Sequence, residues 1–283
     1  MKKIKIITDS TCDLSPELLE KNFVSVLPLM VNFKESSYLD GIDITTSELY
    51  DKVENLGYLP KTSAVTPGRM IEEFEKWLSN GYEVIFTGIS SKMSRTYENA
   101  LLARATVDKK HIHVVDSGNL SSGIGLLVLY MAKLRDEGYK SLEIVKKAKE
   151  KVSLIRSQFV IDRFDYLYKG GRCSGMAKIF GTVLKIKPII CVRNKEMSVG
   201  KKPHGKLEKG LDSLLDMLKA DRDNIDLTNI MLTDSVCPSG VLYLTKKIKE
   251  ILPSANIIHT NAGCVISSHC GKGTVGILYM KLN

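Results

Sequence analysis

The stretch Thr87-Gly-Ile-Ser-Ser-Lys-Met-Ser-Arg-Thr-Tyr97 connects a short apolar strand, Val84-Ile-Phe86, to a helical pattern that continues to Val107. A strand that ends in small hydroxyl residues before a helix leaves free backbone N–H groups at the helix N-terminus, where the macrodipole favours negative charge. We expect Ser94 to cap this helix. The stretch therefore predicts a strand followed by a helix, with a polar anion cradle between them.

Residues 1–155 repeat this alternation of short apolar strands and helices. Strands are predicted at 4–7, 84–86 and 112–115, and helices are predicted to begin near 16, 46, 67, 96, 123 and 142. Such spacing is typical of a parallel sheet covered by helices on both faces, with ligands beyond the carboxyl ends of its strands. The sequence therefore predicts a Rossmann-like, three-layer α/β/α domain over residues 1–155.

Residues 156–283 follow a different pattern, in which three helices accompany at least five strands. A glycine-rich turn is expected at 169–172 and a charged loop at 193–206. This ratio of helices to strands favours a two-layer α+β domain with a mixed sheet. The junction between two such domains is the natural place for a ligand pocket.

Composition limits the classes of protein to consider. The chain has 283 residues, of which 43% are hydrophobic and 26% charged, as in a globular protein of about two domains. No run approaches the roughly 20 apolar residues of a membrane helix, and the first residues reach Asp9 too soon for a signal peptide. We expect a cytoplasmic protein with no integral membrane association.

The formal net charge of +9 raises the question of an acidic partner. The lysines are, however, spread along amphipathic helices such as 142–155, where Lys146, Lys147, Lys149 and Lys151 fall on the outer face. No RNA-stacking motif or zinc finger accompanies them. We expect no nucleic-acid partner, and a basic regulatory protein remains an alternative.

Neither a metal nor a nucleotide cofactor is expected. The six cysteines are scattered, and Cys264 and Cys270, which lie near each other, lack the CxxC spacing of zinc sites and redox pairs. Buried free thiols are therefore expected. The glycine-rich motifs that bind nucleotide phosphates are also absent.

Several side chains are candidates for a binding site. Thr62, Ser63 and Ser94 offer hydroxyl donors without a general base beside them, and the G-x-S-x-G motif of serine hydrolases is absent. His269 is expected in a small-residue turn between two apolar strands, and Arg172 follows two glycines that allow close backbone approach. From residue types alone, a structural role is as compatible with Thr62 and Ser94 as an anion contact, and a lone histidine such as His269 is more often structural.

The motifs of this chain, taken in order, resemble the DegV family of two-domain lipid-binding proteins. The stretches that carry the resemblance are Ile7–Leu14, Lys61–Ser63, Ser90–Tyr97, Val115–Ser117, Asp165–Leu167, Lys169–Arg172, Ile186–Ile189 and His269–Gly276. Six or seven motifs in the right order, with 165–167 and 169–172 counted as one, are hard to obtain by chance.

The resemblance implies a lipid carrier rather than an enzyme. Its ligand would be a long-chain fatty acid such as palmitate, stearate or oleate, with the tail in an apolar tunnel. Thr62 and Ser94 would hydrogen-bond the carboxylate, and Ser63, Thr96, His269 and Arg172 would complete the fatty-acid-binding set. Some members of the family deliver the acid to a kinase, so the catalytic subunit of a fatty acid kinase is a candidate partner.

The chain departs from the family pattern at two places. Ser94-Arg-Thr-Tyr-Glu98 stands where Ser-Gly-Thr-Tyr-Gln is usual, and His204 stands where the charged loop usually has an arginine. These departures weaken the expectation of kinase coupling more than that of fatty-acid binding. The second hypothesis is an enzyme in its own right, a phosphotransferase of dihydroxyacetone-kinase-like fold, against which the missing nucleotide motif counts.

Overall fold

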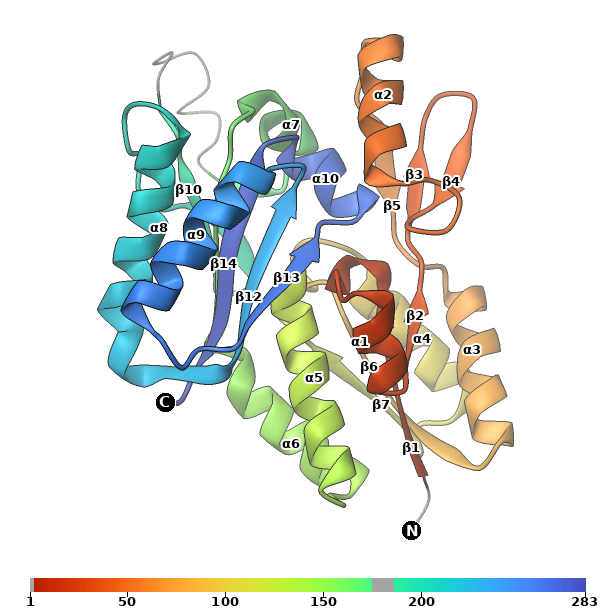
Figure 1. The fold of residues 1–283 in the computed structure, drawn as a ribbon. Coiled ribbons are helices and arrows are strands. Elements are labelled where there is room, and N and C mark those ends of the chain that lie inside the picture. Colours follow the sequence, from red (N-terminus) through yellow and green to blue (C-terminus); the bar gives the residue numbers. More distant parts are fainter. Residues whose placement is uncertain (1–2, 175–185) are drawn as a thin grey trace.

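The computed structural model describes residues 3–174 and 186–283, and its first sheet is parallel. Among the described residues this sheet has four strands in the order β2-β1-β6-β7 (Figure 1). They are β1 (Lys3–Asp9), β2 (Val24–Leu27), β6 (Tyr82–Gly88) and β7 (Ile112–Asp116). Ile6 of β1 pairs with both Val24 and Ile85, which places β1 inside the sheet.

Helices cover both faces of this parallel sheet. Because side chains alternate along a strand, Ile7 and Phe86 pack under α3 (Pro67–Ser79) and α4 (Thr96–Val107). Ile6 and Ile85 face α5 (Ser122–Asp136) and α6 (Ser141–Val152) on the other side. The predicted three-layer α/β/α arrangement is confirmed.

Local signals in the sequence start several of these helices as expected. Ser15 caps α1 (Pro16–Lys21), and Thr66 caps α3, each through its side-chain oxygen. Thr45 and Glu48 form the predicted capping box at the start of α2 (Thr46–Leu56).

The second sheet is mixed. In the part of the chain that the structure describes, its seven strands follow the order β13-β12-β14-β8-β10-β11-β9. Two pairs are parallel, β12 with β13 and β11 with β9, whereas the β12–β14, β14–β8, β8–β10 and β10–β11 pairs are antiparallel. The strands are β8 (Ile155–Val160), β9 (Cys173–Ser174), β10 (Ile189–Arg193), β11 (Glu196–Val199), β12 (Ile225–Ser235), β13 (Ile257–Asn261) and β14 (Thr274–Lys281).

α8 (Leu207–Asp221) and α9 (Pro238–Ile251) cover one face of the mixed sheet, and the predicted α+β class is confirmed (Figure 1). The other face packs on α5, which thus lies between the two sheets (Figure 1). Every residue of α5 from Ser122 to Leu129 is buried, as expected of a helix with no solvent-facing side. We keep the division near residue 155 as a proposal, because β8 begins there while α5 contributes to the packing of both sheets.

A small third sheet, in the order β4-β3-β5, lies beside α2 (Figure 1). It consists of β3 (Met30–Asn32), β4 (Ser37–Leu39) and β5 (Lys61–Ser63). α10 (Cys264–Cys270) packs against β3, β5 and α2, and also against α7 (Phe164–Gly170). This part of the C-terminal chain therefore lies among elements from the first 63 residues.

Three predictions about local structure in the C-terminal part of the chain were wrong. His269 lies in helix α10 and not in a turn, because the helix is capped by distant side chains that no local pattern reveals. The expected glycine-rich turn at 169–172 is the end of α7, where Gly171 adopts a left-handed φ of 65°. The expected charged loop at 193–206 contains strand β11, whose Met197 is buried.

No helix within residues 3–174 and 186–283 combines the length and the apolar character needed to cross a membrane.

Candidate functional site

A cavity of about 460 Å³ lies where the loops after β6 and β7, the mixed sheet, α10 and the small third sheet meet. Most of its wall is apolar, and a volume of several hundred Å³ is typical of small-molecule sites. Side chains from both parts of the chain form this wall, among them Leu29, Ile89, Leu120, Phe159, Leu167 and Leu278. The cavity therefore belongs to neither sheet alone.

Five of the six predicted site residues line this cavity, namely Thr62, Ser63, Ser94, Arg172 and His269. They come from β5, the loop before α4, the segment after α7, and α10. Thr96 does not line the cavity, because its side chain is fully buried at the start of α4. The structure thus collects residues that are up to 207 positions apart in sequence.

Thr62 and His269 form a hydrogen-bonded pair, with 2.9 Å between Thr62 Oγ1 and His269 Nε2. The other ring nitrogen, Nδ1, is buried and has no hydrogen-bond partner among the described residues. Gly170 passes so close that a Cβ at that position would lie 2.4 Å from Nδ1. A glycine at position 170 is therefore required for the ring to occupy this place.

His269 is held in its neutral form. Burial, and to a smaller extent the positive charge of Arg172, lowers the pKa of His269 to about 4. A neutral imidazole has one N–H donor and one acceptor nitrogen. At neutral pH this residue therefore acts in hydrogen bonding and not as a fixed cation.

Ser94 was predicted to cap α4, and this was wrong. The N-cap residue is Arg95, which makes no capping side-chain bond. Ser94 Oγ instead accepts a hydrogen bond from the Thr96 backbone N–H at 3.3 Å and lies 3.0 Å from Thr96 Oγ1. A serine side chain that accepts a hydrogen bond from the N–H two residues later forms a local turn. Ser94 therefore fixes the turn that precedes α4, and Arg95 is the N-cap.

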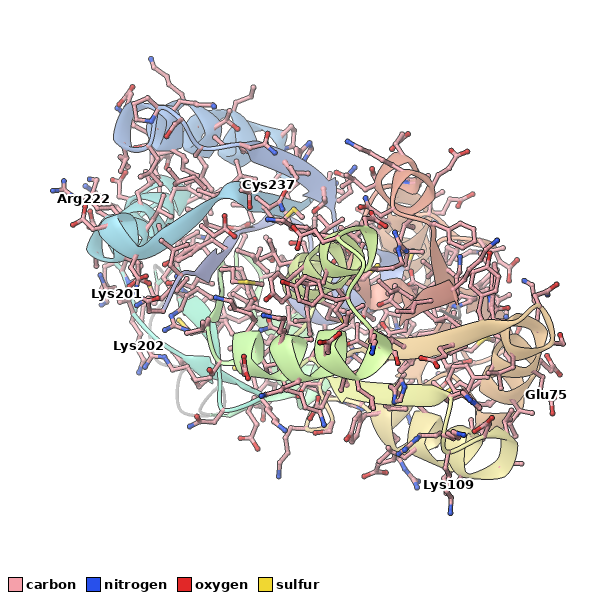
Figure 2. All side chains as sticks on the ribbon, turned by 90° about the horizontal axis from the view of Figure 1, so that it is seen from below. Glu75, Lys109, Lys201, Lys202, Arg222 and Cys237 are labelled. Atoms are coloured by element: carbon pink, nitrogen blue, oxygen red, sulfur yellow. The ribbon has the colours of Figure 1, made fainter. Side chains whose placement is uncertain are left out.

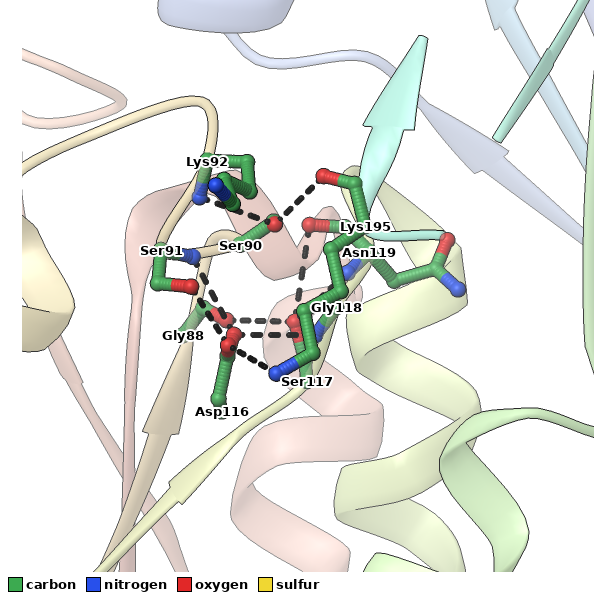
Figure 3. Close-up of polar contacts among 9 residues, drawn as sticks. All are labelled: Gly88, Ser90, Ser91, Lys92, Asp116, Ser117, Gly118, Asn119 and Lys195. Carbon is green, nitrogen blue, oxygen red and sulfur yellow. Dashed lines mark hydrogen bonds and ion pairs between the residues drawn. The ribbon is translucent and has the colours of Figure 1, made fainter. Parts of the chain in front are cut away.

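The loop that carries Ser94 is fixed by Asp116, at the end of β7 (Figure 3). The Asp116 carboxylate accepts from the Ser91 N–H at 3.1 Å, from Ser91 Oγ at 2.6 Å and from the Gly118 N–H at 3.0 Å. Lys195 Nζ, from the other part of the chain, completes the set at 3.0 Å. Burial opposes ionisation of Asp116, but these donors outweigh it and hold its pKa below the usual value.

Lys195 lies in the two-residue turn between β10 and β11. Asn194 and Lys195 both have positive φ, 51° and 70°, as the tightest hairpin turns require. The Lys195 side chain forms the ion pair with Asp116, and the Lys195 backbone carbonyl accepts a 2.7 Å hydrogen bond from Ser90 Oγ (Figure 3). Met197, two residues further on, lines the cavity. We call this set of contacts, among Ser90, Ser91, Asp116 and Lys195, the latch; it joins two walls of the cavity, and the sequence had not predicted it.

Buried carboxylates hold α10 in place. The Gly263 N–H donates to Asp13 at 2.9 Å, and the Cys264 N–H donates to Asp40 at 2.7 Å. Carboxylates at a helix N-terminus are stabilised by its free N–H groups. Burial nevertheless raises the pKa of Asp13 and of Asp40 above the usual value. Asp9 and Asp13 thus accept hydrogen bonds from backbone N–H groups.

Within the described ranges, no three His, Cys, Asp or Glu side chains gather as a set of metal ligands. Five of the six cysteines are buried, and Cys173 is partly exposed.

Comparison with known proteins gives one consistent result. A family model described as an uncharacterised protein of the DegV family matches residues 3–282. A DegV domain-containing protein of Clostridium acetobutylicum is 37% identical over 284 residues, which cover 99% of each chain.

Solved structures agree with this match. A DegV family protein from Thermus thermophilus, described by its fatty-acid binding, superposes with a TM-score of 0.93 at 27% identity and covers 100% of both chains. A DegV lipid-binding protein from Thermotoga maritima superposes with a TM-score of 0.88 at 28% identity and covers 99% of both.

Proposed function

Because the chain belongs to the DegV family, we propose that it binds one long-chain fatty acid in the 460 Å³ cavity, with the carboxylate on Thr62 and Ser94. In this proposal the protein is a carrier without chemistry of its own. The observation that supports it most is a single cavity whose wall is mainly apolar and which also contains a cluster of hydroxyl, imidazole and guanidinium donors.

The donors suit an anion that enters an apolar site. A carboxylate that leaves water must be hydrogen-bonded, and bonds from N–H or O–H groups to an anion are stronger than neutral ones. When His269 Nε2 carries the proton, it donates to Thr62 Oγ1, and the Thr62 hydroxyl hydrogen is then free to point at the ligand. His269 thereby positions the Thr62 donor.

The apolar wall supplies the affinity. A 16-carbon chain buries about 14 methylenes, and at roughly 0.8 kcal/mol each the gross gain is on the order of 11 kcal/mol before association costs. The polar contacts then mainly set which end of the ligand lies at Thr62. We further propose, from the family resemblance, that a bound acid can be presented to a kinase subunit.

Lipid content tests this proposal directly. Protein purified from a bacterial host should release about one long-chain fatty acid per chain on organic extraction, as quantified by mass spectrometry, because an apolar cavity is costly to fill with water. Protein without bound lipid and without affinity for added palmitate or oleate would contradict the proposal.

A double variant tests the orientation of the ligand. Thr62→Val combined with Ser94→Ala should weaken palmitate binding by about tenfold or more, the scale of losing hydrogen bonds to a charged group, and should affect hexadecanol less. Thr106→Val, on the exposed side of α4, is the matched control. Equal losses for acid and alcohol would show that these hydroxyls only support the fold.

A further inference from the structure

A second cavity, of about 820 Å³, lies on the α8 side of the mixed sheet. Phe159 lines the first cavity and Gln158 lines the second, and adjacent residues of a strand point to opposite faces. At these two residues the cavities lie on opposite faces of β8, although Ser157, on the same face as Phe159, also lines the second cavity. The wall of the second cavity includes Arg156, Arg193, Lys195 and Lys201, against two carboxylates, Asp216 and Asp221.

The cations reach this cavity from neighbouring strands. Gln158 of β8 pairs with Cys191 of β10, so Arg156 and Arg193, each two residues beyond that pair, share its face of the sheet. Like charges at such opposed positions destabilise a sheet unless something compensates them. Arg156 is partly compensated, by the Ser153 carbonyl at 2.9 Å and by Asp221 at 3.8 Å.

Arg193 and Lys201 have no such compensation within residues 3–174 and 186–283, where neither forms an ion pair or a side-chain hydrogen bond. Both side chains line the same cavity, and both act on the Cys191 thiol: burial raises the pKa of this thiol, and the two positive charges act in the opposite direction. Position 200 leaves the space open, since a Cβ on Gly200 would lie 2.9 Å from Cys191 Sγ.

Gln158 adds an unsatisfied polar group to the same wall. Its Nε2 donates to Tyr279 Oη at 3.1 Å, and Tyr279 Oη donates to Asp221 at 2.8 Å, which fixes the orientation of the amide. Gln158 Oε1 is buried without a hydrogen-bond partner in the described chain, and the residue is 5% exposed. Buried polar atoms are normally paired, so this acceptor is consistent with a hydrogen-bond donor in the cavity, such as a bound water or a hydroxyl group of a ligand.

We propose that this second cavity binds the phosphate group of a small phosphorylated molecule, with Arg193 and Lys201 as its main contacts. Guanidinium groups match phosphate oxygens in pairs, and a lysine adds a mobile point charge. A phosphate dianion would compensate both free cations and remove the repulsion between Arg156 and Arg193. The phosphate can belong to a soluble compound or to a lipid headgroup.

Two binding experiments distinguish these sources. Inorganic pyrophosphate, titrated by calorimetry at low salt, represents the soluble source, and vesicles of phosphatidylglycerol, assayed by co-sedimentation, represent the lipid source. Wild-type protein should bind at least one of the two probes, and Arg193→Ala with Lys201→Ala should weaken that binding at least tenfold. Lys202→Ala, at the neighbouring residue outside the cavity wall, is the matched control and should bind as the wild type does (Figure 2).

Two further outcomes bear on the role of these side chains. Arg193→Lys should bind more weakly than the wild type but more tightly than the double variant, because the charge is kept while the paired contact is lost. Absence of binding to both probes, binding that the double variant retains, or an equal loss in Lys202→Ala would each overturn the proposal.

Discussion

At the scale of single residues, aspartates at strand ends hold several loops in place by accepting hydrogen bonds from backbone N–H groups. Asp9 accepts from the Ile89 N–H, Asp116 from the Ser91 N–H, and Asp234 from the Cys237 N–H. The sequence shows these residues as a recurring aspartate and serine after an apolar strand. The structure gives them a shared task, which is to fix the loop that follows a strand.

His269 leads to a prediction about pH. Its folded pKa of about 4 lies below the ordinary value of 6.5, so as the pH falls through this window the unfolded chain binds a proton that the folded chain does not bind. Stability is therefore lost between about pH 6.5 and pH 4, by at most about 3 kcal/mol. We compare the free energy of unfolding of lipid-free His269→Gln with that of the lipid-free wild type by urea unfolding. When the pH is lowered from 7.5 to 4.5, the difference should shift in favour of the variant by most of this amount.

The informative quantity is the difference in unfolding free energy between His269→Gln and the wild type. Burial raises the pKa of Asp9 to about 6, which acts in the opposite direction over part of the same range and is common to both proteins. His204→Gln, at an exposed histidine, is the control. A difference between His269→Gln and wild type that does not change with pH would show that the ring is not held neutral.

The sequence indicated which residues lie at the candidate cavity better than it indicated their hydrogen-bond partners. Thr62, Ser63, Ser94, Arg172 and His269 line one cavity, and their role in binding stays a prediction. Their partners were not predictable, because His269 approaches Thr62 from 207 residues away. Only the tertiary fold decides which hydroxyl a buried ring meets.

At the scale of elements, prediction succeeded where the signals are local. α1, α2 and α3 begin at their own capping residues, and all were expected. α10 was missed because its caps, Asp13 and Asp40, lie more than 200 residues earlier. β5 was missed because three residues are too few to show an alternating pattern.

The latch allows a prediction about ligand exchange. Asp116→Ala removes several hydrogen bonds to a charged group and should accelerate release of a bound fatty acid by roughly 10- to 100-fold. Lys195→Met removes one partly exposed ion pair and leaves the Ser90 bond to its backbone, so its effect should stay below about fivefold. Stopped-flow displacement of a fluorescent fatty acid measures both rates.

Lys133→Met is the control for this experiment, because it removes an exposed ion pair with Glu137 at the end of α5 that does not line the cavity. The order of the effects is the decisive result. If Asp116→Ala releases the ligand no faster than Lys195→Met, the latch does not retain it.

At the scale of the whole molecule, α5 joins the two sheets into one hydrophobic core. One cluster contains Ile6 and Ile85 of the parallel sheet, Leu127 and Met131 of α5, and Leu278 of the mixed sheet. The two parts of the chain therefore depend on the same packed residues, although their sheets are separate.

This shared core should make unfolding a single transition. Leu127→Ala, at a fully buried position of α5, should cost about 2–5 kcal/mol and destabilise both sheets together. Fluorescence of Trp77 in α3 reports the first part of the chain, and hydrogen exchange of β12 followed by mass spectrometry reports the second. Leu142→Ala, at an exposed leucine, is the control, and separate midpoints for the two probes would contradict a common core.

The candidate cavity is a gap within this same core, since Ile89, Leu120, Phe159, Leu167 and Leu278 belong to both. A molecule that fills this gap packs against core side chains, and because it binds only the folded protein, its binding increases the free energy of unfolding. Small changes in folding free energy alter how much of a protein escapes degradation in a cell. The abundance of this protein should therefore follow the supply of its ligand, without any change in the rate at which it is made.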